Sequence, residues 1–405
     1  MKSDWKNSTI GDACSLVTDG SHFSPKSVED GEYMASVKDF TEYGFDFTSC
    51  RRISSEDYET LKRSGCVPEQ NDILIGKDGA RYFEDIIIYR QPEQPALLSS
   101  IAILRCDEHE ILPEFLYYTL RAPSFRQDVR DNYGSGSAIP RIILKDFKRM
   151  PISYPSLEDQ KEIVSVLTAL DHRIQTNMKI NDNLQQQMQT LFADWLSANS
   201  ESATKVALGD VCTKVTDGSH FSPKDDPTSS IPMLSVKDMR EFDFDLTSCK
   251  HICEDDYEKM VVNDCVPQVN DILVAKDGSY LKEIFICNEQ RKLAILSSIA
   301  IFRPNATVIH PEILLSFLKS PRVLQEVRDN YVSGSALPRI VLKDFKKLTF
   351  ALPNMDAQNL IAPLFTSIRE QISVNVAENE YMAQLRDALL PKLMSGELGV
   401  DNIQL

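Results

Sequence analysis

The sequence has no long apolar run and no surplus of positive charge. None of its hydrophobic segments approaches the ~18 residues that a membrane span needs. Its first residues, Met1 to Trp5, form no apolar signal region. These absences exclude a membrane anchor and predict a cytoplasmic protein. The net charge of −16 excludes a chain that is basic throughout. DNA affinity depends on local basic surface, so such surface has to be sought within the chain.

Metal-binding and redox spacings are also missing. None of the nine cysteines belongs to a C-x-x-C pair, which argues against a zinc ribbon. The pattern instead predicts reduced, buried thiols in a cytosolic protein. His22 and His220 have no cysteine or histidine at ligand spacing, so we expect hydrogen bonding in a loop rather than metal binding.

The usual catalytic signatures are absent as well. The chain has neither a G-x-x-x-x-G-K-[ST] phosphate loop nor a G-x-G-x-x-G turn. It lacks the Asn-Pro or Asp-Pro-Pro dipeptide that amino-methyltransferases use against a flipped base. Residues 159–161 have the nuclease-like form D-x-K, but both charges are lost at 357–359, so we attribute the match to chance. The sequence therefore offers no catalytic, metal or cofactor site among these patterns.

The chain does contain a long internal repeat. Residues 18–26 return unchanged as residues 216–224, and residues 129–141 return with few changes as 327–339, in both cases 198 positions later. Solenoid repeats are far shorter, at roughly 20–50 residues, whereas each copy here is large enough for a domain and a connector. Two such copies predict a pseudo-dimer, which suits a target with two similar halves.

Each copy predicts a globular region. Residues 1–153 and 201–352 are typical of mixed α/β domains, with short apolar strands at 72–75 and 100–104 and at their repeats, 271–274 and 298–302. Asp-Gly pairs at 19–20, 78–79, 217–218 and 277–278 indicate turns. A short helix is expected over residues 113–120, with Pro113 in its first turn.

A long helix is predicted after each domain, in segments 154–200 and 353–405, the second with a C-terminal tail. Apolar residues recur at spacings of three and four, as in a coiled coil. They are Ile163, Leu167, Leu170, Ile174, Leu184, Met188, Leu191 and Trp195, then Ile361, Phe365, Ile368, Ile372, Met382, Leu389 and Leu393. About 40 residues give a rod of roughly 60 Å.

The chain order favours antiparallel packing of the two rods, with one globular domain at each end. The expected fold class is therefore α+β, with two mixed α/β domains separated by two long antiparallel coiled-coil helices in a pseudo-two-fold arrangement. Polar residues interrupt the apolar pattern at Asn177 and Asn181 and at their repeats, Asn375 and Asn379. Buried asparagines would fix the register; a locally solvated seam is the alternative.

Three repeated polar segments are candidates for binding DNA. Residues 18–26 combine a glycine turn with hydroxyls, an imidazole, an aromatic ring and a lysine; a purely structural turn is the alternative. Lys77 and Lys276 follow a strand and are suited to a phosphate or a guanine edge; a solvated hairpin is the alternative. Residues 135–149 and their repeat form basic clusters beside Gly-Ser loops; an ordinary charged helix face is the alternative.

The candidate DNA-binding residues occupy matching places in the two halves. They are Thr18, Ser21, His22, Lys26, Lys38, Lys77, Arg81, Ser135, Ser137, Arg141 and Lys145, and then Thr216, Ser219, His220, Lys224, Lys237, Lys276, Tyr280, Ser333, Ser335, Arg339 and Lys343.

One place breaks the match between the copies. The first copy has one more residue than the second between Gly79 and Ile86, so Arg81 has no clear counterpart. If Arg81 contacts a base edge, the two half-sites differ at one position; an exposed arginine without a base contact is the alternative.

The chain resembles the specificity subunit of type I restriction-modification systems over essentially its whole length. The resemblance rests on motifs that each occur twice. These are T-D-G-S-H-F-S-P at 18–25 and 216–223, S-V-K-D at 36–39 and 235–238, N-D-I-L at 71–74 and 270–273, L-S-S-I-A-I at 98–103 and 296–301, the G-S-x-x-P segment at 136–148 and 334–346, and the helix start at 155–160 and 353–358. Ala138 and Ala336 depart from the polar residue that is common in the Gly-Ser loop.

The resemblance implies a non-catalytic subunit with two target-recognition domains that reads double-stranded DNA. The implied partners are two methyltransferase subunits and, in restriction complexes, translocase-nuclease subunits. S-adenosylmethionine, ATP and magnesium would belong to those partners, and the methylated base would be a flipped adenine.

Two similar reading domains predict a bipartite, nearly palindromic site with half-site centres about 10 bp apart. This is a sharp expectation, because most members of the family carry dissimilar domains. One alternative is a type II-like system whose partner is a fused methyltransferase-nuclease. Another is a coiled-coil scaffold that binds only proteins.

Overall fold

A computed structural model describes residues 5–79, 81–134, 140–278, 281–330, 332–333 and 339–400. The chain divides into two compact units, residues 1–175 with 380–405, and residues 176–379. Each unit combines one globular region with parts of both long helices. The four domain boundaries expected from the sequence therefore stay a prediction.

The first unit begins with short strands and helices and ends on a long helix. Its elements are β1 (Lys6–Thr9), α1 (Ile10–Ala13), β2 (Cys14–Asp19), β3 (Glu32–Ala35), η2 (Val37–Asp39), β4 (Arg51–Ile53), α2 (Ser55–Arg63), β5 (Ile73–Gly76), β6 (Ile86–Ile88), β7 (Ala96–Leu97), β8 (Ile101–Cys106), α3 (Pro113–Arg121), α4 (Pro123–Asn132), α5 (Leu144–Arg149), β9 (Pro151–Tyr154) and the start of α6 (Leu157–Ala198). The strands and the proline-capped helix expected from the sequence are confirmed.

The second unit repeats this order. Its elements are the end of α6, η3 (Ser200–Ser202), β10 (Thr204–Ala207), β11 (Cys212–Asp217), β12 (Ile231–Leu234), η4 (Val236–Asp238), β13 (Lys250–Ile252), α7 (Glu254–Val262), β14 (Ile272–Ala275), β15 (Ile284–Ile286), β16 (Ala294–Ile295), β17 (Ile299–Pro304), α8 (Pro311–Leu318), α9 (Pro321–Asn330), β18 (Val332–Ser333), β19 (Arg339–Ile340), α10 (Leu342–Phe345), β20 (Thr349–Leu352) and most of α11 (Met355–Met394).

A four-stranded antiparallel sheet lies at the centre of each unit, in the order β2-β8-β5-β6 or β11-β17-β14-β15. Strand side chains alternate between two faces, and both faces of β5 are covered. Ile73 and Ile75 belong to the apolar core shared with α3 and α6, whereas Leu74 belongs to a second core beneath the β4-β3-β7 sheet. This double burial explains the continuous apolar run that predicted the strand.

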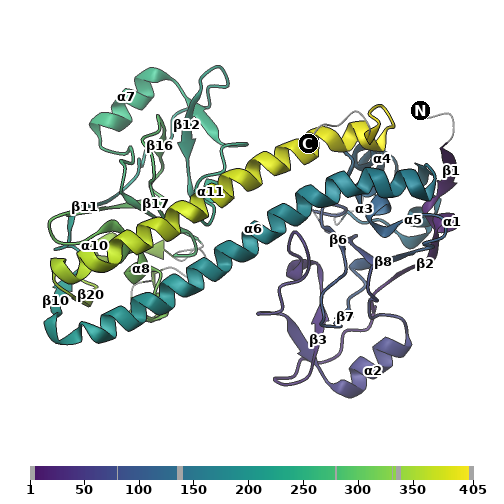
Figure 1. The fold of residues 1–405 in the computed structure, drawn as a ribbon, viewed down its shortest axis with the longest axis horizontal. Coiled ribbons are helices and arrows are strands. Elements are labelled where there is room, and N and C mark those ends of the chain that lie inside the picture. Colours follow the sequence, from purple (N-terminus) through teal and green to yellow (C-terminus); the bar gives the residue numbers. More distant parts are fainter. Residues whose placement is uncertain are drawn as a thin grey trace. The chain divides into compact units, whose positions relative to one another are not determined.

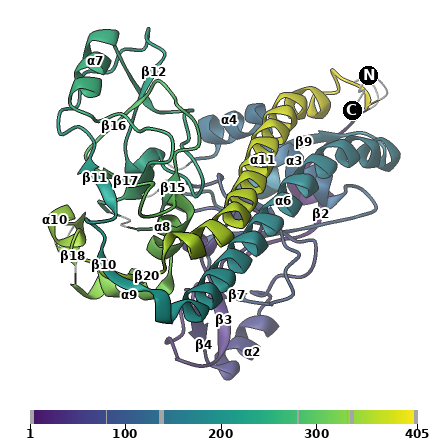
Figure 2. The same ribbon diagram turned by 60° about the vertical axis from the view of Figure 1, so that its left-hand side comes forward.

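The long helices α6 and α11 lie side by side within each unit (Figure 1, Figure 2). In the first unit Asp171 contacts Arg386. In the second, Phe192 contacts Phe365, and Trp195 donates a hydrogen bond to the carbonyl of Ala357. Partner numbers fall along α11 as they rise along α6, so the expected antiparallel pairing is confirmed, and with it the fold class of mixed α/β domains and two long helices.

One apolar position of the predicted seam is wrong. Leu191 is exposed, and its neighbour Phe192 is buried in its place. A straight helix has 3.6 residues per turn, so a strict seven-residue pattern drifts around its surface. The displacement is confined to this turn, because Met188 before it and Trp195 after it are buried as predicted.

Three of the four asparagines of the seam are buried, Asn379 is half-buried, and all four pair across the seam. The Nδ2 of Asn177 donates to the Oδ1 of Asn379 over 3.0 Å, and the Nδ2 of Asn375 donates to Asn181 over 2.7 Å. The amides therefore pair across the seam, and the pairing favours one register because sliding either helix would leave them unpaired in an apolar seam. That they fix the register stays a prediction.

A buried glutamine attaches the start of each long helix to its domain. Gln160 accepts a hydrogen bond from the backbone of Leu112 and donates to the carbonyls of Glu110 and Pro155. Gln358 makes the equivalent bonds with His310, Val308 and Pro353. These contacts explain why the helix-start motif ends in glutamine in both copies.

Candidate nucleic-acid interface

The loop of residues 18–26 follows β2 and is held by backbone contacts. Ser21 pairs with Leu98, and its buried hydroxyl both donates to and accepts from the backbone of Phe23. Gly20 approaches the carbonyl of Leu97 so closely that a Cβ would lie 2.3 Å from it, and Gly218 meets Ile295 in the same way. The glycine is therefore required by close backbone approach, and the serines act inside the loop rather than at its surface.

Lys77 ties this loop to two others. Its ammonium lies 3.3 Å from the Asp19 carboxylate and is buried. Its backbone N–H donates to Ser100, and its carbonyl accepts from Ile142. Lys276 repeats these contacts with Asp217, Ser298 and Ile340. The prediction that these lysines meet DNA stays a prediction, but each buried ammonium group already has a half-buried carboxylate partner.

The three candidate segments meet around Lys77. Asp78 pairs with Arg141, and the N–H of Gly79 donates to the carbonyl of Pro140. Gly79 has φ +97, a conformation that favours glycine. The side of β5 that leads into Lys77 also contacts Val37, which neighbours Lys38. Segments up to 120 positions apart in sequence thus form one continuous edge of the domain.

Exposed basic side chains line this edge in both copies. His22, Lys26, Lys38, Arg141 and Lys145 are exposed, as are His220, Lys224, Lys237, Arg339 and Lys343. Thr18 and Thr216 are half-buried at the strand ends. The imidazoles of His22 and His220 lie 3.6 and 3.3 Å from Asp19 and Asp217. Exposed basic residues therefore occur at matching positions of the two copies, and such residues are suited to attraction by phosphates.

Several predicted residues lie outside what the structure describes. They are Ser135, Ser137, Tyr280 and Ser335, while Ser333 is described only as part of the β18 backbone. The basic clusters next to them are described: Lys145, Lys148 and Arg149 belong to α5, and Lys343 belongs to α10.

Sequence reasoning missed two contributors to this edge. Phe23 and Phe221 are 64% and 61% exposed, although large aromatic side chains usually bury their rings. Their place in the unchanged segment was the available signal. Arg51 donates to the Ser24 hydroxyl over 2.9 Å, and Lys250 donates to Ser222 over 3.0 Å. This bracing had no sequence signal, because β4 and the loop are far apart in the chain.

Arg81 is exposed and lies 2.7 Å from Asp85 and 3.6 Å from Glu84. The two copies align again at Phe83 and Leu281. Both residues are buried and have a positive φ. The backbone N–H of each donates to a carbonyl at the end of the preceding strand. The extra residue of the first copy therefore lies between Gly79 and Phe83, in the stretch that contains Arg81.

A buried arginine–aspartate pair supports the sheet behind this edge. Arg105 makes two hydrogen bonds of 2.8 Å to Asp72, and Arg303 does the same with Asp271. Hydrogen bonding to the aspartate raises the pKa of each guanidinium above its ordinary value. Both aspartates are fully buried, so each depends on its arginine for compensation.

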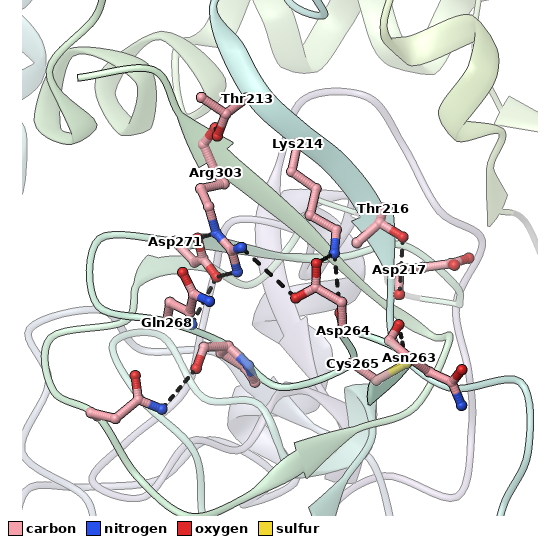
Figure 3. Close-up of polar contacts among 12 residues, drawn as sticks. Thr213, Lys214, Thr216, Asp217, Asn263, Asp264, Cys265, Gln268, Asp271 and Arg303 are labelled. Carbon is pink, nitrogen blue, oxygen red and sulfur yellow. Dashed lines mark hydrogen bonds and ion pairs between the residues drawn. The ribbon is translucent and has the colours of Figure 1, made fainter. Parts of the chain in front are cut away.

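The surroundings of that pair differ between the copies. In the first, Glu69 approaches Arg105 to 2.7 Å. In the second, Asp264 takes this role at 3.8 Å from Arg303 and also pairs with Lys214, as Figure 3 shows. The equivalent positions in the first copy are Gly65 and Leu16. The central pair is kept, while its outer carboxylate comes from a different position of the equivalent loop, the one between α2 and β5 or between α7 and β14.

Within the part of the chain that the structure describes, no three His, Cys, Asp or Glu side chains are grouped to hold a metal ion. Over the same residues, no helix has the length and apolar character to cross a membrane. All nine cysteines are described and are free thiols. Burial raises the pKa of Cys50 to about 11 and that of Cys212 to about 12, which suits inert thiols.

Comparison with known proteins gives consistent matches. The sequence model of the type I restriction modification DNA specificity domain matches residues 2–186 and 200–380. The type I restriction enzyme MjaIX specificity subunit of Methanocaldococcus jannaschii is 25% identical over 323 residues, covering 72% of this chain and 71% of that protein. The HindI specificity subunit of Haemophilus influenzae is 20% identical over 360 residues, with 71% and 78% covered.

A solved structure shares the fold. The S subunit of a type I restriction-modification system from M. genitalium superimposes with a TM-score of 0.52 at 16% identity, and the match covers 96% of each chain.

Proposed function

This chain belongs to the type I restriction modification DNA specificity family, whose members are non-catalytic DNA-recognition subunits, and we propose that it reads a bipartite, nearly palindromic DNA site. The observation that carries the proposal is the repeated exposed edge: the same loop with an exposed phenylalanine, and basic residues at matching positions, occur in both copies. Two readers with the same contact residues favour two similar half-sites.

The contacts divide into two classes. Lys26, Lys38 and Lys145, with their repeats, are exposed cations suited to phosphates, which position the protein without reading sequence. His22, Arg141, Phe23 and their repeats are suited to base edges and thymine methyl groups. Lys77 and Lys276 hold the three loops in place through their buried ion pairs.

The partners follow from the family. The chain would place two methyltransferase subunits for adenine methylation of the recognised site, and translocase-nuclease subunits would join in restriction. S-adenosylmethionine, ATP and magnesium would be bound by those partners, which carry out the chemistry on a flipped base. Half-site centres about 10 bp apart would present both reading edges to one side of the DNA.

Methylome sequencing of a host that carries the system tests the proposal. We expect one bipartite motif whose halves are near reverse complements and contain adenine methylation. Two unrelated half-sites would contradict the near-palindrome while leaving the recognition role intact. The absence of any motif dependent on this chain would contradict the recognition role itself.

A further inference from the structure

Equivalent positions on the two long helices carry different charges. Asp171 on α6 corresponds to Arg369 on α11, and Met188 on α6 corresponds to Arg386 on α11, each 198 positions later. All four lie on the faces where the helices meet. The repeat is nearly symmetric at the asparagines of the seam, so these positions are where the two helices become chemically distinct.

In the first unit, the two charged side chains meet in a buried cluster. The guanidinium of Arg386 lies 2.7 Å from the carboxylate of Asp171, and both side chains are less than a tenth exposed. The hydroxyl of Tyr118 donates to the same carboxylate over 2.6 Å. Burial raises the pKa of Tyr118, and the Asp171 charge raises it further, so the tyrosine stays a donor.

In the second unit, the equivalent described residues, Arg369 and Met188, differ from the first because methionine carries no charge. Arg369 and Met188 line one shared apolar pocket. Arg369 instead lies 3.2 Å from Glu312, which also accepts a hydrogen bond from Thr366 over 2.9 Å. The corresponding glutamate of the first unit, Glu114, pairs with Arg90, and position 90 is matched by Asn288.

We propose that this arrangement makes α6 and α11 selective for each other over a second copy of themselves. If α6 paired with another α6 in the same register, Asp171 would face Met188 twice and lose its cation. If α11 paired with another α11, Arg369 would face Arg386 twice. The asparagine contacts would form in every combination of the two helices. They therefore set the register, and the charged residues determine which helix is the partner.

The size of the effect follows from burial. Removing one member of a buried ion pair leaves an uncompensated charge. A pair of α6 helices would contain two Asp171 carboxylates without a cation. A pair of α11 helices would oppose Arg369 and Arg386 twice, although Arg369 keeps Glu312 and Arg386 keeps its neighbour Asp387. The native pairing contains neither defect. This inference concerns the partner choice of the chain's own helices and does not depend on the DNA site proposed above.

The test compares pairings in a chain cut after folding. A protease site is inserted between α6 and β10, at residues 199–203, and the folded chain is cleaved there. The two halves are separated in urea, allowed to reassociate by dilution, and counted by native mass spectrometry. We expect mixed pairs to exceed like pairs by on the order of 100-fold. A statistical mixture would overturn the proposal.

A redesigned first unit sharpens the test. The variant R90N/D171R/R386M gives the first unit the charges of the second, with Glu114 released to pair with the new arginine. Every combination of helices then places arginine opposite methionine, so we expect mixed and like pairs near the statistical proportion. The control K392M removes an exposed cation of α11 and should keep the wild-type preference. Selectivity that survives in the redesigned variant would overturn the proposal.

A measurement on the uncut chain remains decisive if the halves do not reassociate. A double-mutant cycle with D171N and R386M reports how strongly the two side chains depend on each other. We expect the equilibrium constants of unfolding to show a coupling of about tenfold. A coupling below about twofold would overturn the proposal, because an uncoupled pair cannot direct the choice of partner.

Discussion

Asp171 and Arg369 occupy the same position in the two copies and carry opposite charges. Around Arg105 and Arg303, by contrast, the central ion pair is kept and only the outer carboxylate moves. The sheet that supports the reading edge is therefore repeated faithfully, whereas the helix faces have diverged. The difference indicates that two reading domains can remain alike while the helices that join them take distinct roles.

The largest expected effect concerns the feature that the copies share. Arg105→Met and Arg303→Met each leave a fully buried aspartate without its cation, and each should lower the free energy of unfolding by about 3–5 kcal/mol. Urea denaturation measures both losses. The control Glu69→Gln changes only an exposed partner and should cost less than about 1 kcal/mol. A small loss in one copy alone would break the equivalence of the two sheets.

The helix faces should respond unequally. Arg386→Met strands the buried carboxylate of Asp171, and we expect a loss of about 3 kcal/mol in the free energy of unfolding. Arg369→Met should cost less, about 1–2 kcal/mol, because the Arg369 side chain is 19% exposed and lies 3.2 Å from Glu312, whereas the Arg386 side chain is 7% exposed and lies 2.7 Å from Asp171. Equal losses in the free energy of unfolding would mean that the different charges at these helix positions do not distinguish the two units.

The reading edges should differ at Arg81. If its guanidinium reads a base, Arg81→Ala should weaken the preference at one position of one half-site by about 1–3 kcal/mol. Binding of the complex with methyltransferase to a library of sites measures this preference. Lys282→Ala, an exposed cation of the second copy near the equivalent loop, serves as the control. Uniform weakening across all sequences would identify a phosphate contact instead.

The smallest effect is expected where the second copy departs from the first beside Arg303. The variant K214L/D264G gives the second copy the residues of the first. It removes an ion pair but also relieves the positive φ of Asp264, +57, where the first copy has Gly65. Because these terms oppose each other, the free energy of unfolding should change by less than about 1 kcal/mol. A loss above about 2 kcal/mol, which is the scale of a partly buried ion pair, would show that Lys214 is essential to this cluster.

Much of the fold could be predicted because the signals are local. The apolar runs at residues 73–75 and 272–274, the proline before α3, and the heptad spacing of α6 and α11 each describe a few consecutive turns or strand positions. The error at Leu191 has a related origin, since a heptad spacing does not say which of two neighbouring apolar residues, Leu191 or Phe192, is buried in that turn.

The candidate site could be predicted only in part. The repeated loop of residues 18–26 pointed to the reading edge, but Lys77 was expected at its surface and its ammonium lies buried against Asp19. No residue close to Lys77 in the sequence indicates that Asp19, which lies on another strand, is its partner. The bracing of Ser24 by Arg51 escaped notice for the same reason.

Residue order alone shows that the chain has two copies of one domain, each followed by a long amphipathic helix. Repeats and periodicity can be read in this way because they are properties of order along the chain. Which charged side chains compensate each other follows from the tertiary structure and not from residue order. Asp171 and Arg386 are 215 positions apart. Their opposite charges compensate each other because the antiparallel helices bury the two side chains together. An unpaired charge costs little free energy in water and much in an apolar seam. Burial therefore requires the two charged side chains to pair.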